Sequence, residues 1–292
     1  MARSRTGAVT IVEVGTRDGF QSVAAEIPTE DKIKIIDLLA EAGITRIEAS
    51  SFVHPKWVPQ LKDAVEVFRG IAYRPGVSYS ALIPNERGLD RAIEIGVKEV
   101  VYVVSASDSL NRSNFNRSTA ESLAEVSAVA ARAGEHGIRF RGVVAASFGC
   151  PFEGQVPVDK VIQVAQEFQR AGAFEVSLAD TGGMAHPIQV RETLARFLHE
   201  VQGVDVSVHF HNTLGVGMAN VLAAWESGIG IVESSIAGLG GCPYAPGAPG
   251  NVPTEGVVFM LHKMGVDTGV NLDKLLGCAE LVRQTIHREA CD

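Results

Sequence analysis

The feature that most constrains the fold is a regular alternation of strand-like and helix-like segments along the chain. Short apolar, β-branched runs such as 8–14 alternate with amphipathic stretches such as 29–43, in which apolar residues recur at helical spacing. Thr29 is the expected N-cap of that first helix and Gly43 its stop. Successive strand–helix units form a parallel sheet, and eight units close into a (β/α)8 TIM barrel.

The expected elements follow one another without a linker or a low-complexity segment. The eight predicted strands occupy 8–14, 46–52, 77–83, 99–106, 138–148, 174–180, 204–212 and 231–241. The eight predicted helices occupy 29–43, 58–70, 85–96, 118–137, 157–172, 186–203, 215–228 and 255–265. We expect one TIM-barrel domain over 1–292, with an extra C-terminal helix at about 271–289. An open doubly wound sheet competes, but it usually carries a GxGxxG turn after its first strand, where this chain reads GTRDGFQS.

Composition narrows the classes of partner. The formal net charge is -8, from 26 basic and 34 acidic residues, which argues against a nucleic-acid surface. The 4 cysteines are widely spaced and form no CxxC pair, as expected for a reduced, cytoplasmic protein. No apolar run approaches the roughly 18 residues of a membrane span. We therefore expect a small-molecule substrate, with no nucleic-acid partner and no membrane.

Polar residues gather where the predicted strands end, which is where TIM-barrel active sites are built. These residues are Arg17, Asp18, Glu48, Asp180, His209 and His211, with Cys242 and Asn251 in the loop after the eighth strand. The barrel therefore predicts that residues distant in sequence meet at one mouth.

His209 and His211 are two positions apart on one strand and so project to the same side. Two imidazoles at that spacing can bind one metal ion, although a strand histidine is more often a hydrogen-bonded core residue. Asp18 is the best third ligand, while an aspartate that only stabilises the turn is the alternative. Two histidines, a carboxylate and an amide oxygen suit Mg²⁺ or Mn²⁺, and zinc remains an alternative.

Five segments carry a family resemblance: VEVGTRDGFQ, IEASSFVHPKWVPQL, GCPFEG, VHFHNTLG and GLGGCPYAPGAPGNVPTE. They resemble, in order from about residue 10 to residue 275, the hydroxymethylglutaryl-CoA lyase family, which is related to isopropylmalate and homocitrate synthases. Those synthases usually have a GERxGN-like loop instead of GGCPYAPGAPGN. The resemblance implies cleavage of 3-hydroxy-3-methylglutaryl-CoA to acetoacetate and acetyl-CoA, as in leucine degradation and ketone-body formation, and a dimer or tetramer of identical chains.

The same resemblance implies a role for each polar position. Asp18, His209, His211 and Asn251 become the metal ligands, and Arg17, Cys242, Asp18 and His209 the catalytic residues. Arg17 stabilises the enolate oxygen and Cys242 assists proton transfer. Arg17, Gln21, Glu48, Ser51 and Asp180 become substrate-binding or supporting positions, and Arg141 lines or braces the site. The alternatives are a buried Arg141 paired only with Glu13 and Glu48, and a Cys150 that serves packing.

Three departures from the family pattern bear on the substrate: Asn212, Ala179 and the segment QSVAAE. They leave open a lyase for another 3-substituted 3-hydroxyglutaryl-CoA or for a citramalyl-CoA-like thioester. A Claisen-type acyl-CoA synthase and a non-catalytic, metal-braced barrel are further alternatives. Joint retention of Arg17, Cys242 and the four ligand positions argues against the non-catalytic barrel, because a bracing metal needs neither Arg17 nor Cys242.

Overall fold

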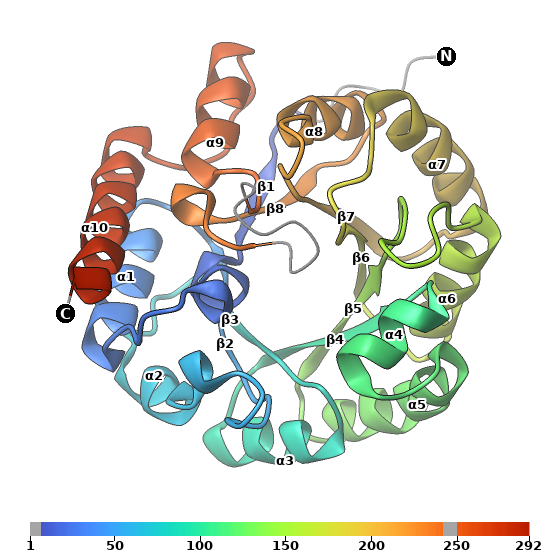
Figure 1. The fold of residues 1–292 in the computed structure, drawn as a ribbon, viewed down its shortest axis with the longest axis horizontal. Helices are drawn as coiled ribbons and strands as arrows, with labels where there is room; N and C mark the ends of the chain where they lie inside the picture. Colours follow the sequence, from blue (N-terminus) through green and yellow to red (C-terminus); the bar gives the residue numbers. More distant parts are fainter. Residues whose placement is uncertain (1–6, 242–249, 292) are drawn as a thin grey trace.

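All eight predicted strands are present, and they pair in sequence order into a closed parallel barrel (Figure 1). The computed structural model describes residues 7–241 and 250–291. The strands are β1 (Thr10–Glu13), β2 (Arg46–Ser51), β3 (Ser78–Leu82), β4 (Glu99–Ser105), β5 (Arg139–Ala145), β6 (Glu175–Asp180), β7 (Asp205–Phe210) and β8 (Ile231–Ser234). The barrel closes through parallel pairing of β1 with β8, which confirms the predicted fold class.

Helices surround the barrel, one or more after each strand (Figure 1). They are α1 (Thr29–Glu41), α2 (Ala64–Gly70), α3 (Glu86–Ile95), α4 (Asp108–Phe115), α5 (Thr119–Glu135), α6 (Val158–Arg170), α7 (Pro187–Glu200), α8 (Gly217–Glu226), α9 (Thr254–Lys263) and α10 (Leu272–Cys291). The predicted C-terminal helix is α10, and it packs against α1 and α9 outside the ring. Among the described residues, no helix has the length and apolarity to span a membrane.

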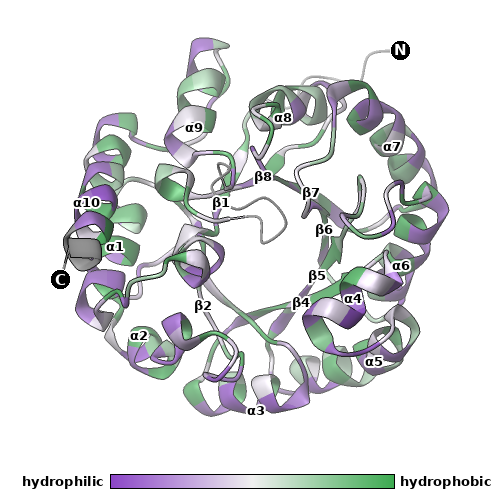
Figure 2. Cartoon of the chain, viewed as in Figure 1, coloured by the Kyte–Doolittle hydropathy of each residue, from purple (hydrophilic) through white to green (hydrophobic). Residues whose placement is uncertain are grey.

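The hydrophobic core fills the space between the barrel and its helices. Figure 2 shows largely hydrophobic β4 and β5, whereas the surrounding helices mix hydrophobic and hydrophilic residues. Phe168 of α6 and Phe197 of α7 are fully buried on this inner side of their helices. The barrel interior is different, because charged residues such as Arg141 and Glu48 are completely buried there.

Two local predictions are wrong, and one helix lies where none was predicted. Thr29 does not cap α1: it is the first helical residue after Pro28, and its hydroxyl donates to Asp63 Oδ2 at 2.7 Å. The helix expected at 58–70 starts only at Ala64, because the segment before it forms a separate 3₁₀ turn, η3 (Pro59–Leu61). Helix α4 was not predicted at all, since its sequence DSLNRSNF is mostly polar and reads as a loop.

Candidate metal and catalytic site

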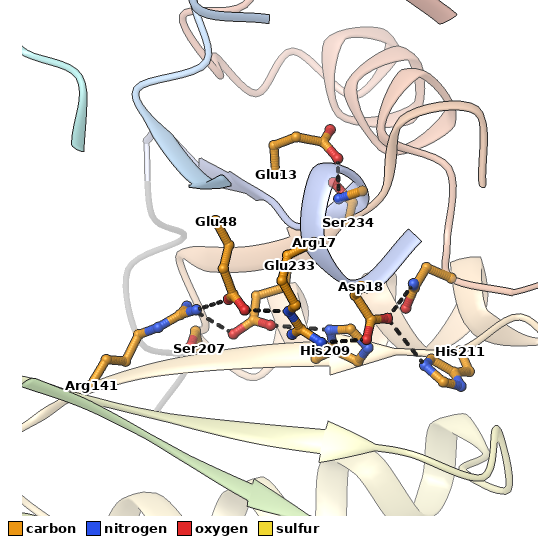
Figure 3. Close-up of polar contacts among 12 residues, drawn as sticks. Glu13, Arg17, Asp18, Glu48, Arg141, Ser207, His209, His211, Glu233 and Ser234 are labelled. Carbon is orange, nitrogen blue, oxygen red and sulfur yellow. Dashed lines mark hydrogen bonds and ion pairs between the residues drawn. The ribbon is translucent and has the colours of Figure 1, made fainter. Parts of the chain in front are cut away.

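The first half of the site is a tight turn that follows β1. This turn, η1 (Gly15–Gly19), is a single π-helical turn that carries Arg17 and Asp18 side by side. Arg17 Nη1 donates to Asp18 Oδ1 at 2.6 Å, and Gln21 Nε2 donates to the same oxygen at 2.8 Å. Asp18 Oδ2 remains directed toward the second half of the site, as its contacts there show (Figure 3).

The two histidines supply the second half. His209 lies in β7 and His211 directly after it, and their ring centroids are 5.1 Å apart. Both residues are 93% buried. Ligand atoms of Asp18, His209 and His211 all lie within 4.8 Å of one another, and Asp18 Oδ2 is 4.0 Å from His211 Nε2. The predicted convergence of these three residues at the barrel mouth is therefore present.

Asn251 joins the cluster from the far end of the β8–α9 loop. Its Nδ2 donates to Asp18 Oδ2 at 2.7 Å and to the Leu239 carbonyl at 3.0 Å. Its Oδ1 is buried without a hydrogen-bond partner in the described structure. A Cβ atom added to Gly250 would lie 2.3 Å from the Gly240 carbonyl carbon, so the backbones before and after 242–249 touch.

The donor set fits a divalent cation in three respects. A buried amide oxygen with no partner is costly unless a ligand occupies its lone pairs. Burial favours the protonated form of Asp18, but Arg17 and the two histidines oppose this and hold its pKa at about 2. Burial is the largest cause that lowers the pKa of His211, to about 4. Asp18 and His211 are thus deprotonated near neutral pH, as metal ligands must be.

Arg17 is held by a fully buried carboxylate. Its Nε donates to Glu48 Oε1 at 2.5 Å, while Glu48 Oε2 accepts from Arg141 Nη2 at 2.7 Å. Glu48 is completely buried and both of its oxygens are engaged. Its contacts position the Arg17 guanidinium. The supporting role expected for Glu48 remains a prediction, and its hydrogen bond with Arg17 supports that prediction.

Two other predicted positions bond to the backbone. Ser51 Oγ donates to the Leu82 carbonyl and accepts from the Val53 N–H. Asp180 accepts from the backbone N–H groups of Met184 and Ala185, and burial raises its pKa to about 6 against those two hydrogen bonds. Their substrate-binding roles remain predictions.

Cys242 lies outside the described residues. Cys150 is fully buried and its Sγ lies 2.9 Å from Ser107 Oγ, as a packed thiol would. The alternative pairing of Arg141 with Glu13 is wrong. Glu13 instead accepts from the backbone of Gly15 and Ile236 and from Thr254 Oγ1, and so ties the first turn to the β8–α9 loop.

Sequence reasoning missed Glu233. This β8 residue is 97% buried, and its Oε2 lies 3.0 Å from His209 Nδ1. With Nδ1 donating its proton to Glu233, the Nε2 lone pair of His209 is free to bind a metal ion. The available signal was a glutamate inside the apolar run IVESS, since a buried carboxylate needs a partner.

The departure at Asn212 lies beside the ligands without joining them. Asn212 Oδ1 accepts from the Gly217 N–H at the start of α8, and its own N–H donates to the Gly250 carbonyl at 2.7 Å. Ala179 is 94% buried and packs with Val101 and Val143. Neither departure alters any of the four predicted ligand residues.

The chain resembles known proteins over nearly its whole length. Residues 8–282 match the HMGL-like family. The mitochondrial hydroxymethylglutaryl-CoA lyase of Rattus norvegicus is 46% identical over 281 residues, covering 96% of this chain and 86% of the rat protein. The hydroxymethylglutaryl-CoA lyase YngG of Bacillus subtilis is 44% identical over 276 residues, covering 94% of this chain and 92% of that protein.

Solved structures give the same result. The Bacillus subtilis HMG-CoA lyase superposes with a TM-score of 0.95 at 43% identity, covering 98% of this chain and 96% of that one. An Acinetobacter baumannii HMG-CoA lyase in complex with coenzyme A and 3-methylmalate has a TM-score of 0.93 at 38% identity, covering 98% and 93%. The carboxyl transferase domain of Rhizobium etli pyruvate carboxylase shares only the fold, at 16% identity and a TM-score of 0.73.

Proposed function

We propose roles for these residues from the premise that the chain belongs to the HMGL-like family. Its activity is that of a hydroxymethylglutaryl-CoA lyase, a carbon–carbon lyase that cleaves 3-hydroxy-3-methylglutaryl-CoA to acetoacetate and acetyl-CoA. The observation that carries the residue roles is the convergence of Asp18, His209, His211 and the unpartnered Asn251 Oδ1 beside Arg17.

The reaction needs two kinds of assistance. The tertiary hydroxyl must lose its proton as the carbon–carbon bond breaks, and the acetyl-CoA enolate that forms must be stabilised and then protonated. A bound divalent ion, Mg²⁺ or Mn²⁺, supplies Lewis acidity at that hydroxyl. Asp18, His209, His211 and Asn251 hold the ion, so Asp18 and His209 contribute to catalysis as ligands.

Arg17 supports the other side of the reaction. Its guanidinium is fixed by Glu48 at 2.5 Å and by Asp18 at 2.6 Å, and it is only 11% exposed. A fixed cation beside the thioester oxygen opposes charge that develops only as the bond breaks. Gln21 steadies Asp18 through its 2.8 Å hydrogen bond.

Cys242 assists the proton transfer that completes the reaction, from the protein to the enolate carbon that becomes the methyl group of acetyl-CoA. A thiol has an ordinary pKa of about 8.5 and can exchange a proton close to neutral pH. Ser51 and Asp180 brace the mouth through the backbone contacts described above. We further propose a cytoplasmic homo-oligomer, a dimer or tetramer, which light scattering on the purified protein tests directly.

A substrate panel tests the proposed function. The purified protein is incubated with Mg²⁺ and, separately, with 3-hydroxy-3-methylglutaryl-CoA, another 3-substituted 3-hydroxyglutaryl-CoA and citramalyl-CoA, and the products are identified by mass. We expect acetoacetate and acetyl-CoA from the first thioester and at least about tenfold slower cleavage of the others. Preferential cleavage of citramalyl-CoA would assign a different substrate to the same site.

A further inference from the structure

One buried arginine connects the two halves of the site. Arg141 of β5 is completely buried inside the barrel (Figure 3). Its Nη2 donates to Glu48 Oε2 at 2.7 Å, and its Nη1 donates to Glu233 Oε1 at 3.0 Å. The remaining oxygen of each carboxylate contacts a residue of the site: Glu48 Oε1 accepts from Arg17 and Glu233 Oε2 bonds to His209. Arg141 is thus two hydrogen bonds away from both Arg17 and His209.

Stability alone does not account for this arrangement. A buried ion pair is often no more stabilising than apolar residues of the same volume, because both charges lose their hydration. A barrel of this size could be filled with branched apolar side chains, as TIM-barrel interiors usually are. We therefore attribute the presence of these buried charges to the geometry that they impose on neighbouring side chains.

The guanidinium is suited to impose that geometry. Its donors are fixed in one plane, so that two carboxylates bound to Nη1 and Nη2 take a set separation and angle. Each carboxylate then orients its second partner.

We propose that Arg141 is a positioning residue for both halves of the reaction centre. Through Glu48 it fixes the Arg17 guanidinium, and through Glu233 it fixes the ring orientation and the tautomer of His209. This inference rests on the proposed function for the role of Arg17, whereas its metal-binding half can be tested without substrate.

The barrel offers a matched control in Arg46. Its Nη1 donates to Glu175 Oε2 at 2.6 Å and its Nη2 lies 3.6 Å from Glu99 Oε1. It is a second barrel arginine paired with carboxylates, at the amino end of β2, two residues before Glu48. Arg46 contacts neither Glu48 nor Glu233 in the described structure and reaches Arg141 only through Glu175, whose Oε1 accepts from Arg141 Nη1 at 3.4 Å. Loss of Arg46 therefore removes a cation from the same barrel while the contacts of Glu48 with Arg17 and of Glu233 with His209 stay in place.

The experiment measures two quantities on the same purified variants. The Kd for Mn²⁺ is measured by electron paramagnetic resonance without substrate, and kcat for 3-hydroxy-3-methylglutaryl-CoA is measured at saturating Mn²⁺. We expect Glu233→Gln to raise the Kd at least about tenfold, the usual effect of losing a residue that orients a ligand. We expect Glu48→Gln to lower kcat at least about tenfold while the Kd changes less than about threefold.

Arg141→Gln should show both defects at once, and Arg46→Gln should change each quantity by less than about threefold. Arg141→Lys separates charge from geometry, because one ammonium group cannot hold both carboxylates in the plane of a guanidinium. It should restore the melting temperature more than the Kd or kcat.

Three outcomes would overturn the proposal: a full functional rescue by Arg141→Lys, equal defects in Arg46→Gln, or an unchanged Mn²⁺ Kd in both Arg141→Lys and Glu233→Gln. If Arg141→Gln does not fold, the Mn²⁺ Kd and the kcat of Arg141→Lys and Glu233→Gln still test the proposal. A wild-type protein that leaves 3-hydroxy-3-methylglutaryl-CoA intact would contradict the proposed function alone, because the Mn²⁺ measurements need no turnover.

Discussion

Asn251 and Asp18 are joined by a 2.7 Å hydrogen bond between Nδ2 and Oδ2, although 233 residues separate them in sequence. This bond holds the amide so that Oδ1 is buried without a partner in the described structure. The amide cannot satisfy Oδ1 by rotating without giving up its hydrogen bond to Asp18. This geometry supports the proposal that Asn251 is a metal ligand, and its contribution can be measured.

Asn251→Ala should raise the Kd for Mn²⁺ at least about tenfold, because it removes one oxygen donor from the site. Isothermal titration of the metal-free protein measures this. The control is Asn111→Ala, which removes a buried amide whose Nδ2 bonds to the Arg117 and Ser118 carbonyls in the β4–α5 connection. That variant should lower the melting temperature and leave the Kd unchanged; an unchanged Kd in Asn251→Ala would exclude it as a ligand.

Removal of the divalent ion should abolish cleavage, and addition of Mg²⁺ or Mn²⁺ should restore it. His209→Ala should lose at least about a hundredfold of the metal affinity, because it loses a ligand together with the contact that Glu233 provides. His262→Ala, which alters an imidazole on α9 that bonds to Thr268, is the matched control. Full turnover by metal-free His209→Ala protein would contradict the assignment.

Arg17→Gln should lower kcat at least about a hundredfold and change KM less than about threefold, since the lost interaction forms mainly in the transition state. Arg74→Gln, at a surface ion pair with Glu41, controls for loss of a cation and should leave both constants unchanged. Weaker binding with normal kcat would make Arg17 a substrate anchor instead.

Cys242→Ser keeps the size of the side chain but raises its pKa far above neutral, so kcat should fall at least about a hundredfold while metal content stays constant. Turnover, metal content and melting temperature are measured on one preparation. A fall in melting temperature with near wild-type kcat would indicate a packing role.

Burial, opposed by three hydrogen bonds, raises the pKa of Glu13 from 4.5 to about 7. The folded chain then binds this proton more tightly than the unfolded chain, so the contribution of Glu13 is greatest below pH about 4.5 and declines as the pH rises to about 7. Glu13→Gln should remove this decline, which amounts to about 3 kcal/mol. The free energy of unfolding is measured against pH by denaturant titration for the wild type and for the variant. Subtracting one curve from the other cancels the contribution of Asp180, whose pKa is also raised, and leaves that of Glu13. Parallel curves would contradict the prediction.

Much of the fold was predictable because strand and helix periods differ and each unit is bounded by polar or glycine residues. The ends of the strands were not predictable, because apolar residues continue beyond the last paired residue. The strand predicted at 231–241 is an example, since β8 ends at Ser234. Helix α4 was missed because tertiary and capping contacts stabilise it, such as the hydrogen bond from the Leu110 N–H to Ser107 Oγ.

The convergence of Asp18, His209 and His211 was predictable because HxH spacing and barrel topology each leave few options, whereas Asn251 was proposed as a ligand only through the family resemblance. The residues that hydrogen-bond to these side chains were harder to predict, because the strand register decides which residues face each other across the barrel. Glu233 stands opposite His209 in the β7–β8 pairing, a relation that no local pattern encodes. The assignment of Glu13 to Arg141 failed for the same reason.

The contact between Gly240 and Gly250 makes the position of Asn251 independent of the length of the chain between these two glycines. Because these two backbones touch, the chain that joins them can gain or lose residues without displacing Asn251. Changes in the length of the chain between 241 and 250 are therefore separable from changes at the proposed metal centre.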